Sequence, residues 1–275
     1  MQKVAITGST GLIGSRTVQL LNNQFEFIPL STSDGFDITN VDSVNQRLTN
    51  LDFDLLLHLA AYTSVDGAEK DKELAYAINV SGTKNVFEAT NRMKKKFIYI
   101  STDFVFDGKN PPYYEDSTPN PILHYGLTKY EGEKLLNGQA MIIRLSYPYG
   151  YSFARKQDLV GSIKTALDQK KTLYMMKDAL ITPTFIDDIV YCFAHLMKNY
   201  ENKTYHIVGS ASLSPYEIGK KIAKRYSLNG NQIKPTTYNE YLRNKAKRPQ
   251  FSEIKSKNND FYSMKSFDNG LDIIS

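Results

Sequence analysis

Tyr125 and Lys129 stand four positions apart in the stretch YGLTKYEGEKLL (125–136), a spacing that suits acid–base chemistry. If the stretch is helical, one turn separates the two residues, so their side chains lie on one face and can act together. A free phenol titrates at about 10, and a neighbouring ammonium favours the phenolate and lowers that pKa. The spacing alone does not decide, because Tyr130 and Lys134 repeat it in what could be an ordinary surface helix.

A hydroxyl and a carboxylate offer a third component of the same chemistry. Thr102 and Asp103 lie in ISTDFVFDG (100–108), where an apolar segment ends. Ligands of open α/β sheets bind beyond the carboxyl ends of the strands, so Thr102 is expected near Tyr125 and Lys129. Tyr125 would then donate a proton to a carbonyl as a hydride reaches its carbon, while Thr102 hydrogen-bonds the substrate oxygen. Lys129 would also bind the hydroxyls of a nicotinamide ribose.

The stretch GSTGLIG (8–14) predicts where a dinucleotide binds. It follows an apolar strand segment and opens a helical pattern, within residues 3–23. The first glycine permits a tight turn, the second lets the backbone approach a pyrophosphate, and the third allows close packing of helix on strand. Free N–H groups at the helix start would face the phosphates. The expected cofactor contacts are Gly8, Thr10, Gly11, Leu12, Ile13 and Gly14.

The end of the second strand segment bears on which dinucleotide is used. An acidic residue at this place holds the ribose 2′-hydroxyl of NAD. Here the segment 25–31 runs into Ser31 and Thr32, whose hydroxyls tolerate a 2′-phosphate. Arg16 is a more distant candidate for binding that phosphate. The sequence therefore favours NADP(H) and leaves NAD(H) open.

The elements that must position these residues alternate between strand and helix. Each strand segment is apolar on both faces, which is typical of a parallel sheet covered by helices on both sides. Right-handed crossovers then give a Rossmann-type, doubly wound α/β fold, expected over residues 1–150. After the opening strand, the expected strands are 25–31, 53–61, 96–102 and 140–146, and the expected helices include 41–50, 72–93 and 125–137.

Residues 151–275 are expected to form mainly a smaller, substrate-binding C-terminal lobe. One helix near 187–199 should return to pack on the sheet. Ser214 and Pro215 predict the start of another helix, as N-cap and first-turn residue. From about Lys234 the chain is polar and shows little periodicity. The expected helices are 158–170, 185–200 and 214–228, and the expected strands are 171–176 and 203–209.

Composition excludes several classes of protein. The 275 residues are 41% hydrophobic, with 34 basic and 29 acidic side chains, which predicts a globular chain with a large core. The net charge of +5 is spread along the chain, so we expect no nucleic-acid partner, although it suits an anionic substrate. Cys192 is the one cysteine, and the four histidines are scattered, so we expect neither a disulfide framework nor a metal site. No segment predicts a membrane span or a signal peptide, and we expect a cytoplasmic protein.

The GxxGxxG spacing resembles that of the extended short-chain dehydrogenase/reductases. A closer resemblance, to the dTDP-4-dehydrorhamnose reductase family, rests on HLAAYTSVDGAEKDKELAYAINVSGT, STDFVFDG, PYYEDSTPNPILHYGLTKYEGEKLL, IIRLSYPYG and KRPQFSEI, which cover most of the chain in order. This resemblance implies an NAD(P)H-dependent oxidoreductase that reduces a nucleotide-linked 4-keto-6-deoxy sugar, in dTDP-L-rhamnose biosynthesis or a related pathway. It also implies that Thr102, Tyr125 and Lys129 are the catalytic residues.

The same resemblance implies further contacts. Adenine contacts are expected at Asp37 and Ile38, and Asn79 matches an asparagine with a structural or a cofactor-binding role. Arg248 is a candidate for the substrate diphosphate or, alternatively, a surface cation. The remaining implied cofactor contacts are Leu59, Ala60, Ala61 and Tyr62, and the remaining implied substrate contacts are Thr63, Val65, Asp66, Asp103, Phe104 and Tyr147.

Two departures from the family lie on the sugar side, so alternatives stay open. Phe104 stands where these reductases usually have tyrosine, and Tyr147 stands where they usually have tryptophan. A nucleotide-sugar epimerase is one alternative. A dehydratase is disfavoured, because dehydratases of this class have Asp-Glu after the hydroxyl residue, whereas Thr102 is followed by Asp-Phe. Another alternative is a non-catalytic, dinucleotide-binding subunit like the regulatory subunit of methionine adenosyltransferase. A homodimer is one possible assembly of this protein.

Overall fold

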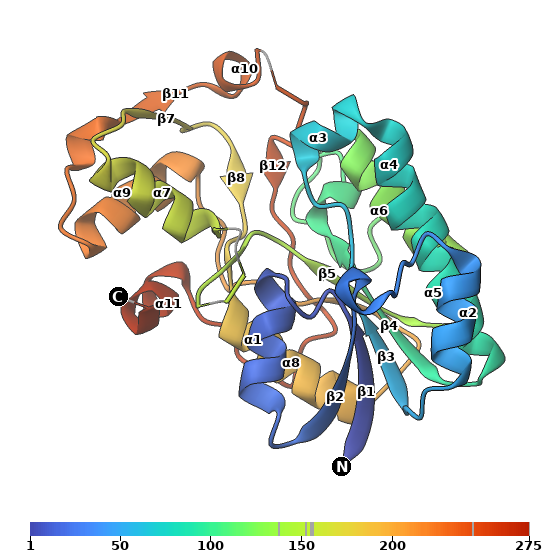
Figure 1. The fold of residues 1–275 in the computed structure, drawn as a ribbon. Helices are drawn as coiled ribbons and strands as arrows, with labels where there is room; N and C mark the ends of the chain where they lie inside the picture. Colours follow the sequence, from blue (N-terminus) through green and yellow to red (C-terminus); the bar gives the residue numbers. More distant parts are fainter. Residues whose placement is uncertain (137, 152, 155–156, 244, 275) are drawn as a thin grey trace.

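The computed structural model describes residues 1–136, 138–151, 153–154, 157–243 and 245–274. Its centre is a six-stranded sheet in the order β10-β5-β4-β3-β1-β2, with every neighbouring pair parallel (Figure 1). The predicted doubly wound parallel sheet is confirmed. The strands are β1 (Gln2–Thr7), β2 (Phe25–Leu30), β3 (Leu55–His58), β4 (Lys96–Thr102), β5 (Met141–Leu145) and β10 (Thr204–His206).

Helices cover both faces of this sheet. Alternate residues of a strand point to opposite faces, so Val4 and Ile6 of β1 pack in one core cluster and Ala5 packs in the other. The first cluster lies under α1 (Leu12–Leu21) and α8 (Ile186–Lys198). The second lies under the other helices, α2 (Val41–Thr49), α5 (Thr83–Arg92) and α6 (His124–Leu136). The predicted last residue of α6, at position 137, lies outside the described residues.

The segment predicted as one helix over 72–93 contains a wider turn. It begins as α4 (Lys72–Tyr76), continues as a π-helical stretch η2 (Ala77–Gly82) and ends as α5. Gly82 lies where a Cβ would come within 2.7 Å of Ile38, so glycine allows this turn to approach the loop after β2. Short π-helical turns are frequent at functional sites, and this one carries Asn79.

The lobe is built from short elements around a third core cluster. Ser214 caps α9 with a reciprocal capping box and Pro215 in the first turn, as predicted. Two short parallel strand pairs, β7–β11 and β8–β12, complete it. The elements of the lobe are α7 (Leu159–Asp168), β7 (Leu173–Met176), β8 (Leu180–Ile181), α9 (Pro215–Arg225), β11 (Ile233–Thr236), α10 (Tyr238–Tyr241), β12 (Phe251–Ser252) and α11 (Phe267–Ile274).

The stretch beyond Lys234, which shows little periodicity in the sequence, nevertheless forms short elements. That stretch contains β11, α10, β12 and α11, which are too short to give a hydrophobic repeat. In α11 only Phe267, Gly270 and Leu271 are buried, and Phe267 packs edge-to-face on Tyr149.

The sheet unit extends past the predicted boundary at residue 150. Strand β10 pairs with β5 at the edge of the sheet. Helix α8 packs against α1 (Figure 1). Tyr113 also forms an isolated bridge with Ile254. The sheet and the lobe therefore interleave along the sequence and meet over the carboxyl ends of the strands.

Two absences concern the described residues alone. None of their helices combines the length and the apolar character that crossing a membrane requires. They also contain no group of three or more His, Cys, Asp and Glu side chains able to hold a metal ion.

Candidate active site

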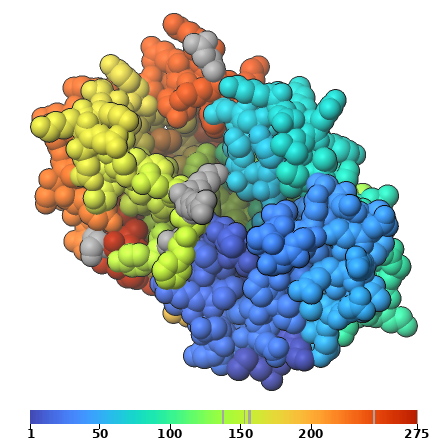
Figure 2. Space-filling view, viewed as in Figure 1, coloured from blue at the N-terminus to red at the C-terminus, as the bar shows by residue number. Residues whose placement is uncertain are grey.

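A large cleft opens over the carboxyl ends of the strands, between the sheet and the lobe. Its volume is ≈ 1390 Å³. Figure 2 shows the surface hollowed between the blue to cyan N-terminal half and the yellow to orange lobe. The residues of the sequence prediction that line it are Gly8, Thr10, Gly11, Leu12, Ile13, Gly14, Ser31, Asp37, Ile38, Leu59, Ala60, Ala61, Thr63, Val65, Thr102, Asp103, Phe104, Tyr125, Lys129 and Tyr147.

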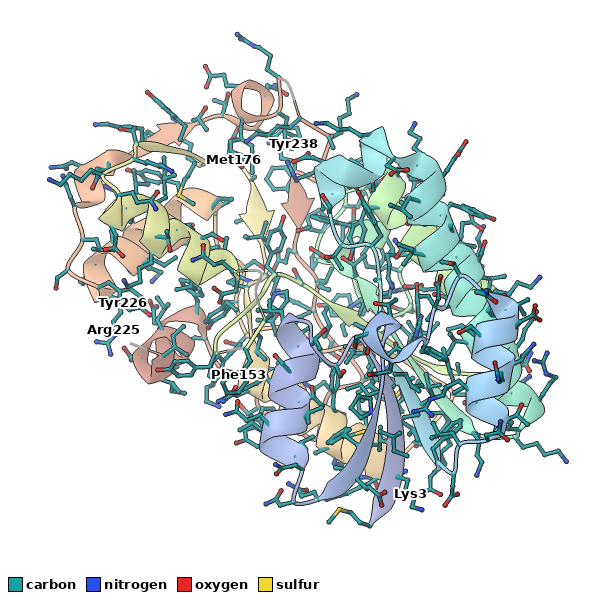
Figure 3. The ribbon with its side chains drawn as sticks, viewed as in Figure 1. Lys3, Phe153, Met176, Arg225, Tyr226 and Tyr238 are labelled. Atoms are coloured by element: carbon teal, nitrogen blue, oxygen red, sulfur yellow. The ribbon has the colours of Figure 1, made fainter. Side chains whose placement is uncertain are left out.

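Sequence reasoning missed the wall that the lobe contributes. Phe153 lines the cleft and remains 74% exposed, and Figure 3 shows it beside α1. The apolar spacing of α7 predicted a helix but not which of its residues face the cleft. The lobe residues missed here are Phe153, Ala154, Gln157, Asp158, Leu159, Ser162 and Ile163.

The glycine loop occupies one end of the cleft in the predicted strand–turn–helix setting. Gly8 has φ +68°, and a Cβ there would lie 2.8 Å from the backbone of Leu59 and Ala60. A Cβ at Gly14 would overlap the carbonyl oxygen of Gly8. The first turn of α1 contains no acidic residue, so its N–H groups and the positive end of the helix dipole are available to phosphates.

Helix α6 brings Tyr125 and Lys129 to Thr102 at the end of β4. The pKa of Tyr125 is raised above its usual value of 10.0, first by burial and second by the charge of Asp103. A hydrogen bond with the Thr102 side chain acts in the opposite direction. The sequence argument expected a neighbouring ammonium to lower this pKa, but burial dominates. The phenol is therefore held protonated, which is the form a proton donor needs.

Lys129 lies at the cleft floor, and its ammonium is more easily deprotonated than usual. Burial lowers the pKa of its ammonium from 10.5 to about 7, and the charge of Glu133, one turn later on α6, acts in the opposite direction. The ammonium sits 4.0 Å from the ring centre of Tyr99, a cation–π contact. Burial, with a smaller effect of Lys129, lowers the pKa of His58 to about 3.

Thr102 and Asp103 are joined by a hydrogen bond. Thr102 Oγ1 donates to Asp103 Oδ1 at 3.0 Å, and Ser146 Oγ donates to Asp103 Oδ2 at 3.0 Å. Burial raises the pKa of Asp103 to about 6 although the hydroxyls around it favour the carboxylate. Phe104 stands edge-on to both Tyr125 and Tyr147, with ring centres 6.0 and 5.9 Å apart.

Tyr62 and Asn79, predicted to contact the cofactor, do not line the cleft. Asn79 is fully buried, accepts a hydrogen bond from Tyr62 N at 2.8 Å and donates to Tyr62 O at 3.2 Å. It also donates to Thr128 on α6 at 3.0 Å. Asn79 therefore fixes the backbone after β3, next to the cleft-lining residues Ala60 and Ala61.

A second network fixes the same edge of the sheet. His58 lies 2.8 Å from Thr7 Oγ1 through Nδ1 and 3.2 Å from Thr83 Oγ1 through Nε2. The Thr83 hydroxyl donates to Asn79 O, so it accepts from His58, and Thr7 donates to Nδ1 while accepting from Ala60 N. This neutral histidine joins the strand end before the glycine loop to the π-helical turn.

At the end of β2, Ser31 is hydrogen-bonded within its own turn. Its Oγ donates to Asp34 Oδ2 at 2.7 Å and lies 2.6 Å from Ser33 Oγ. Arg16, the more distant candidate for a 2′-phosphate, is instead paired with Asp187 of α8 through two hydrogen bonds of 2.6 Å. The hydroxyls of Ser31 and Thr32 are thus the predicted 2′-phosphate contacts that do line the cleft.

Arg248 lies outside the main cleft, in an adjoining cavity of ≈ 750 Å³ in the lobe. Tyr147, Leu159 and Ile163 line both cavities, so they form the boundary between them. Arg248 Nη2 donates to Asp66 Oδ2 at 3.0 Å, which identifies a partner on α3 (Val65–Lys70). Among the described residues, buried Nη1 of Arg248 has no hydrogen-bond partner.

Comparisons with known proteins agree with this geometry. A family model described as RmlD substrate binding domain matches residues 1–268. The probable low-salt glycan biosynthesis reductase Agl14 of Haloferax volcanii is 32% identical, covering 80% of this chain and 78% of the relative. Methionine adenosyltransferase 2 subunit beta of Xenopus tropicalis is 28% identical, covering 86% of this chain and 75% of the relative.

A solved structure gives the same result. The crystal structure of dTDP-4-dehydrorhamnose reductase from Bacillus anthracis in complex with NADP superposes with a TM-score of 0.91 and 32% identity. The match covers 100% of this chain and 99% of that protein. UDP-glucose 4-epimerase of Thermotoga maritima, with a TM-score of 0.84 and 18% identity, shares the fold.

Proposed function

The chain belongs to the RmlD substrate binding domain family, and on that premise we propose that it is an NADPH-dependent reductase of a nucleotide-linked 4-keto-6-deoxy sugar. One observation carries the proposal. A protonated Tyr125 stands with Lys129 and Thr102 at the floor of a cleft whose other end is a phosphate-binding glycine loop. This set suits the reduction of a carbonyl by proton donation beside a nicotinamide.

The residues of this chain fit a dinucleotide. Gly8 and Gly14 leave no room for a Cβ, so the backbone can approach a pyrophosphate at the start of α1. Ser31 and Thr32 would meet a 2′-phosphate with hydroxyls, and Lys129 would bind the nicotinamide ribose. The B. anthracis relative, at 32% identity, is a complex with NADP, which supports NADP(H) over NAD(H) here. When bound, the cofactor supplies the hydride.

The roles of the catalytic residues follow from their surroundings. Tyr125 donates its phenolic proton to the carbonyl oxygen, at C4 of the sugar if the substrate is that of the B. anthracis relative. Lys129, when protonated, would stabilise the phenolate that remains, since a nearby opposite charge favours the ionised form. Thr102 holds the substrate oxygen through its hydroxyl. The apolar ring of Phe104 limits water beside Tyr125.

The proposal is tested by NADPH and NADH oxidation with dTDP-4-keto-6-deoxy-L-sugar generated in situ. We expect Tyr125→Phe to lower kcat about 10²- to 10⁴-fold, as expected for loss of a general acid, while dinucleotide affinity stays unchanged. Tyr130→Phe is the matched control, because Tyr130 repeats the spacing to a lysine on the same helix outside the cleft. Equal activity in both variants would reject the assignment of the proton donor.

A second candidate function is a non-catalytic, dinucleotide-binding subunit. The 28% identity with methionine adenosyltransferase 2 subunit beta over 86% of the chain favours it. Saturable dinucleotide binding without turnover of any keto sugar, together with a stable hetero-complex, would support this candidate. An epimerase would instead copurify with tightly bound NAD.

Two further expectations concern the protein in the cell. We propose a cytoplasmic location, where nucleotide sugar and NADPH would both be available, and a homodimer. Cell fractionation checks the first and light scattering on the purified protein checks the second.

A further inference from the structure

Asp103 lies at the floor of the cleft, and each of its carboxyl oxygens accepts a hydrogen bond. Oδ1 accepts from Thr102 and Oδ2 accepts from Ser146, each at 3.0 Å. The residue is 2% exposed, and Ser252 of β12, fully buried, lies close enough to favour the carboxylate. These bonds connect the carboxylate directly to the Thr102 hydroxyl, so Asp103 can act on the reaction through its neighbours in addition to the substrate contact expected from the sequence.

The hydrogen bond to Asp103 determines where the Thr102 hydroxyl points. A threonine hydroxyl has a single hydrogen, and here it is directed to Asp103 Oδ1. While that bond persists, Thr102 cannot donate to the oxygen of a substrate. If Asp103 were protonated, its oxygens would accept more weakly and the Thr102 hydrogen would be free to turn to the substrate.

The charge of Asp103 also acts on Tyr125. Its carboxylate opposes formation of the phenolate and raises the pKa of Tyr125, next in size to the effect of burial. A phenol with a higher pKa is a weaker acid, so an ionised Asp103 slows donation of the proton. Both effects have the same sign: the neutral form of Asp103 favours reduction.

We propose that Asp103 is a positioning residue whose protonation turns the Thr102 hydroxyl to the substrate and strengthens Tyr125 as a proton donor. The inference rests on the proposed reductase function. It adds no covalent step. Hydride reaches the carbonyl carbon and the Tyr125 proton reaches the oxygen, while Asp103 changes only the hydrogen bonding and the charge beside them.

The surroundings of Asp103 place its effect in an accessible pH range. Burial raises its pKa to about 6, so the rate of reduction should rise as pH falls through that value. The other ionisable groups on which its charge acts are the phenols of Tyr125 and Tyr147, which burial keeps neutral. Lys129 loses its charge above about 7, so it adds a separate decline on the alkaline side.

The experiment measures kcat and KM for sugar reduction across pH in wild type, Asp103→Asn and Ser146→Ala. Wild-type kcat should rise about three- to tenfold as pH falls from about 7.5 to about 5, as for an acid strengthened by up to a pKa unit. Asp103→Asn should lose this rise and keep the decline due to Lys129. Ser146→Ala removes a donor to the carboxylate, so it should move the rise to higher pH.

Asp107→Asn is the matched control. Asp107 lies four residues along, bonds Tyr113 and Asn120 and does not line the cleft, so its loss should leave the wild-type pH profile. A raised KM for Asp103→Asn, with the pH rise in kcat retained, would make Asp103 a sugar ligand and overturn the inference. If Asp103→Asn fails to fold, Ser146→Ala decides alone: an unmoved rise overturns the inference.

A measurement without turnover separates this inference from the proposed function. Carbon-13 ring labels on tyrosine, with the Tyr125 signal assigned by Tyr125→Phe, report the titration of Asp103 through its effect on the phenol. The signal should shift with a midpoint of about pH 6 in wild type and stay constant in Asp103→Asn. If the protein does not reduce the sugar, the proposed function fails, and this titration still supports or overturns the role of Asp103.

Discussion

The buried ionisable groups around the cleft are all displaced towards their neutral forms. The pKa values of Tyr125 and Asp103 are raised, and those of Lys129 and His58 are lowered, with burial as the largest cause in each case. Burial disfavours whichever form carries charge. Near neutral pH, Tyr125 and His58 are therefore neutral, whereas Asp103 is ionised above about pH 6 and Lys129 is only partly charged near pH 7.

The buried His58 makes the free energy of unfolding depend on pH. Its pKa is about 3 in the folded protein and 6.5 when exposed, so the unfolded chain binds the proton more readily between these values. The contribution of the neutral His58 side chain to the free energy of unfolding is complete above pH 6.5, and it falls as the pH decreases towards 3. At about pH 5 the loss is about 2 kcal/mol, from about 1.4 kcal/mol per pKa unit.

Urea unfolding at about pH 7 and about pH 5 measures this loss. His58→Asn should lose less stability over that interval than wild type, because it has no imidazole to protonate. His195→Gln, at an exposed position, should lose as much as wild type. An identical pH dependence in wild type and His58→Asn would contradict the assignment.

Sequence named candidate residues of both kinds, but it gave geometry only for those whose chemistry is local and gave no partners for those that act across the fold. The glycine loop and the spacing of Tyr125 and Lys129 are short patterns that imply geometry without knowledge of the fold. Asn79 bonds to a backbone 17 residues away, and Arg248 pairs with an aspartate 182 residues away. No spacing in the sequence indicates such partners, so their positioning roles appeared only in the structure.

At the scale of elements, two glycines let α6 lie close to the end of β4. A Cβ at Gly126 would overlap the carbonyl oxygen of Phe104, and a Cβ at Gly132 would overlap the hydroxyl of Tyr99. This close approach is what sets Tyr125 and Lys129 beside Thr102. The approach of α6 to β4 therefore depends on the absence of a side chain at these two positions.

Gly126→Ala should move the start of α6 away from Phe104. A displacement of about 1 Å can cost up to about 10²-fold in rate, so we expect kcat to fall at least tenfold with a small loss in Tm. Gly230→Ala is the control, since a Cβ there would have its nearest neighbours at 3.8 Å. Steady-state kinetics and thermal unfolding of both variants check this, and unchanged kcat in Gly126→Ala would show that the helix tolerates the shift.

Helices and strands were predictable from the sequence where the hydrophobic pattern extends over most of the element. The sheet strands and α8 show it clearly, because they are apolar throughout or along one broad face. The π-helical turn at Ala77–Gly82 was not foreseen, since its residues continue a helical pattern. The placement of β10 was missed because its pairing with β5 joins segments about sixty residues apart in sequence.

At the scale of the molecule, a salt bridge ties the sheet unit to the lobe beside the cleft. Asp66 on α3 accepts from Arg248 at 3.0 Å and from Ala246 N at 3.2 Å. Burial opposes ionisation of Asp66, but its neighbours, with the charge of Arg248 foremost, bring its pKa below the usual 3.8. With one nitrogen unpartnered among the described residues, Arg248 can bind an anion in the lobe cavity without releasing Asp66.

Arg248→Met should raise KM for the nucleotide sugar about 10- to 100-fold, since a charge-assisted hydrogen bond contributes about 1.5–3 kcal/mol. The affinity for dinucleotide should not change, because Arg248 lies outside the main cleft. Lys247→Met removes the same charge from an exposed neighbour and should leave KM unchanged. Equal KM values in the two variants would make Arg248 a purely structural cation.

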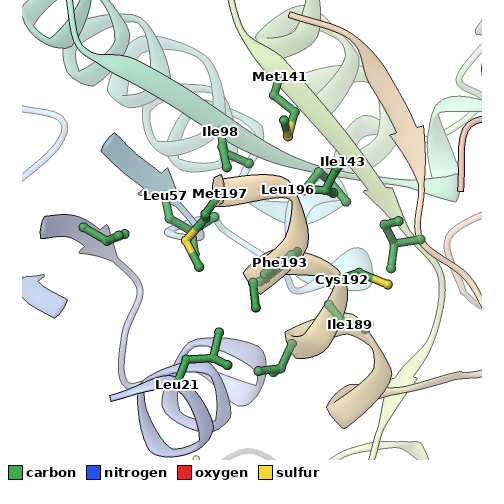
Figure 4. Packing of buried hydrophobic residues seen from close by; sticks show 14 of the residues in the cluster. Leu21, Leu57, Ile98, Met141, Ile143, Ile189, Cys192, Phe193, Leu196 and Met197 are labelled. Carbon is green, nitrogen blue, oxygen red and sulfur yellow. The ribbon is translucent and has the colours of Figure 1, made fainter. Parts of the chain in front are cut away.

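The late position of α8 and β10 in the chain has a consequence for how the protein is made. Figure 4 shows Ile189, Cys192, Phe193 and Leu196 of α8 packed among residues of the earlier strands. Until residue 206 has left the ribosome, β10 cannot pair with β5, so β5 is an unpaired edge strand. The sheet face that α8 covers is likewise exposed until α8 has been made. A nascent chain of 150 residues lacks α8 and β10, so the sheet unit can be completed only after both have been synthesised, and a gene fragment ending at residue 150 should yield aggregated polypeptide.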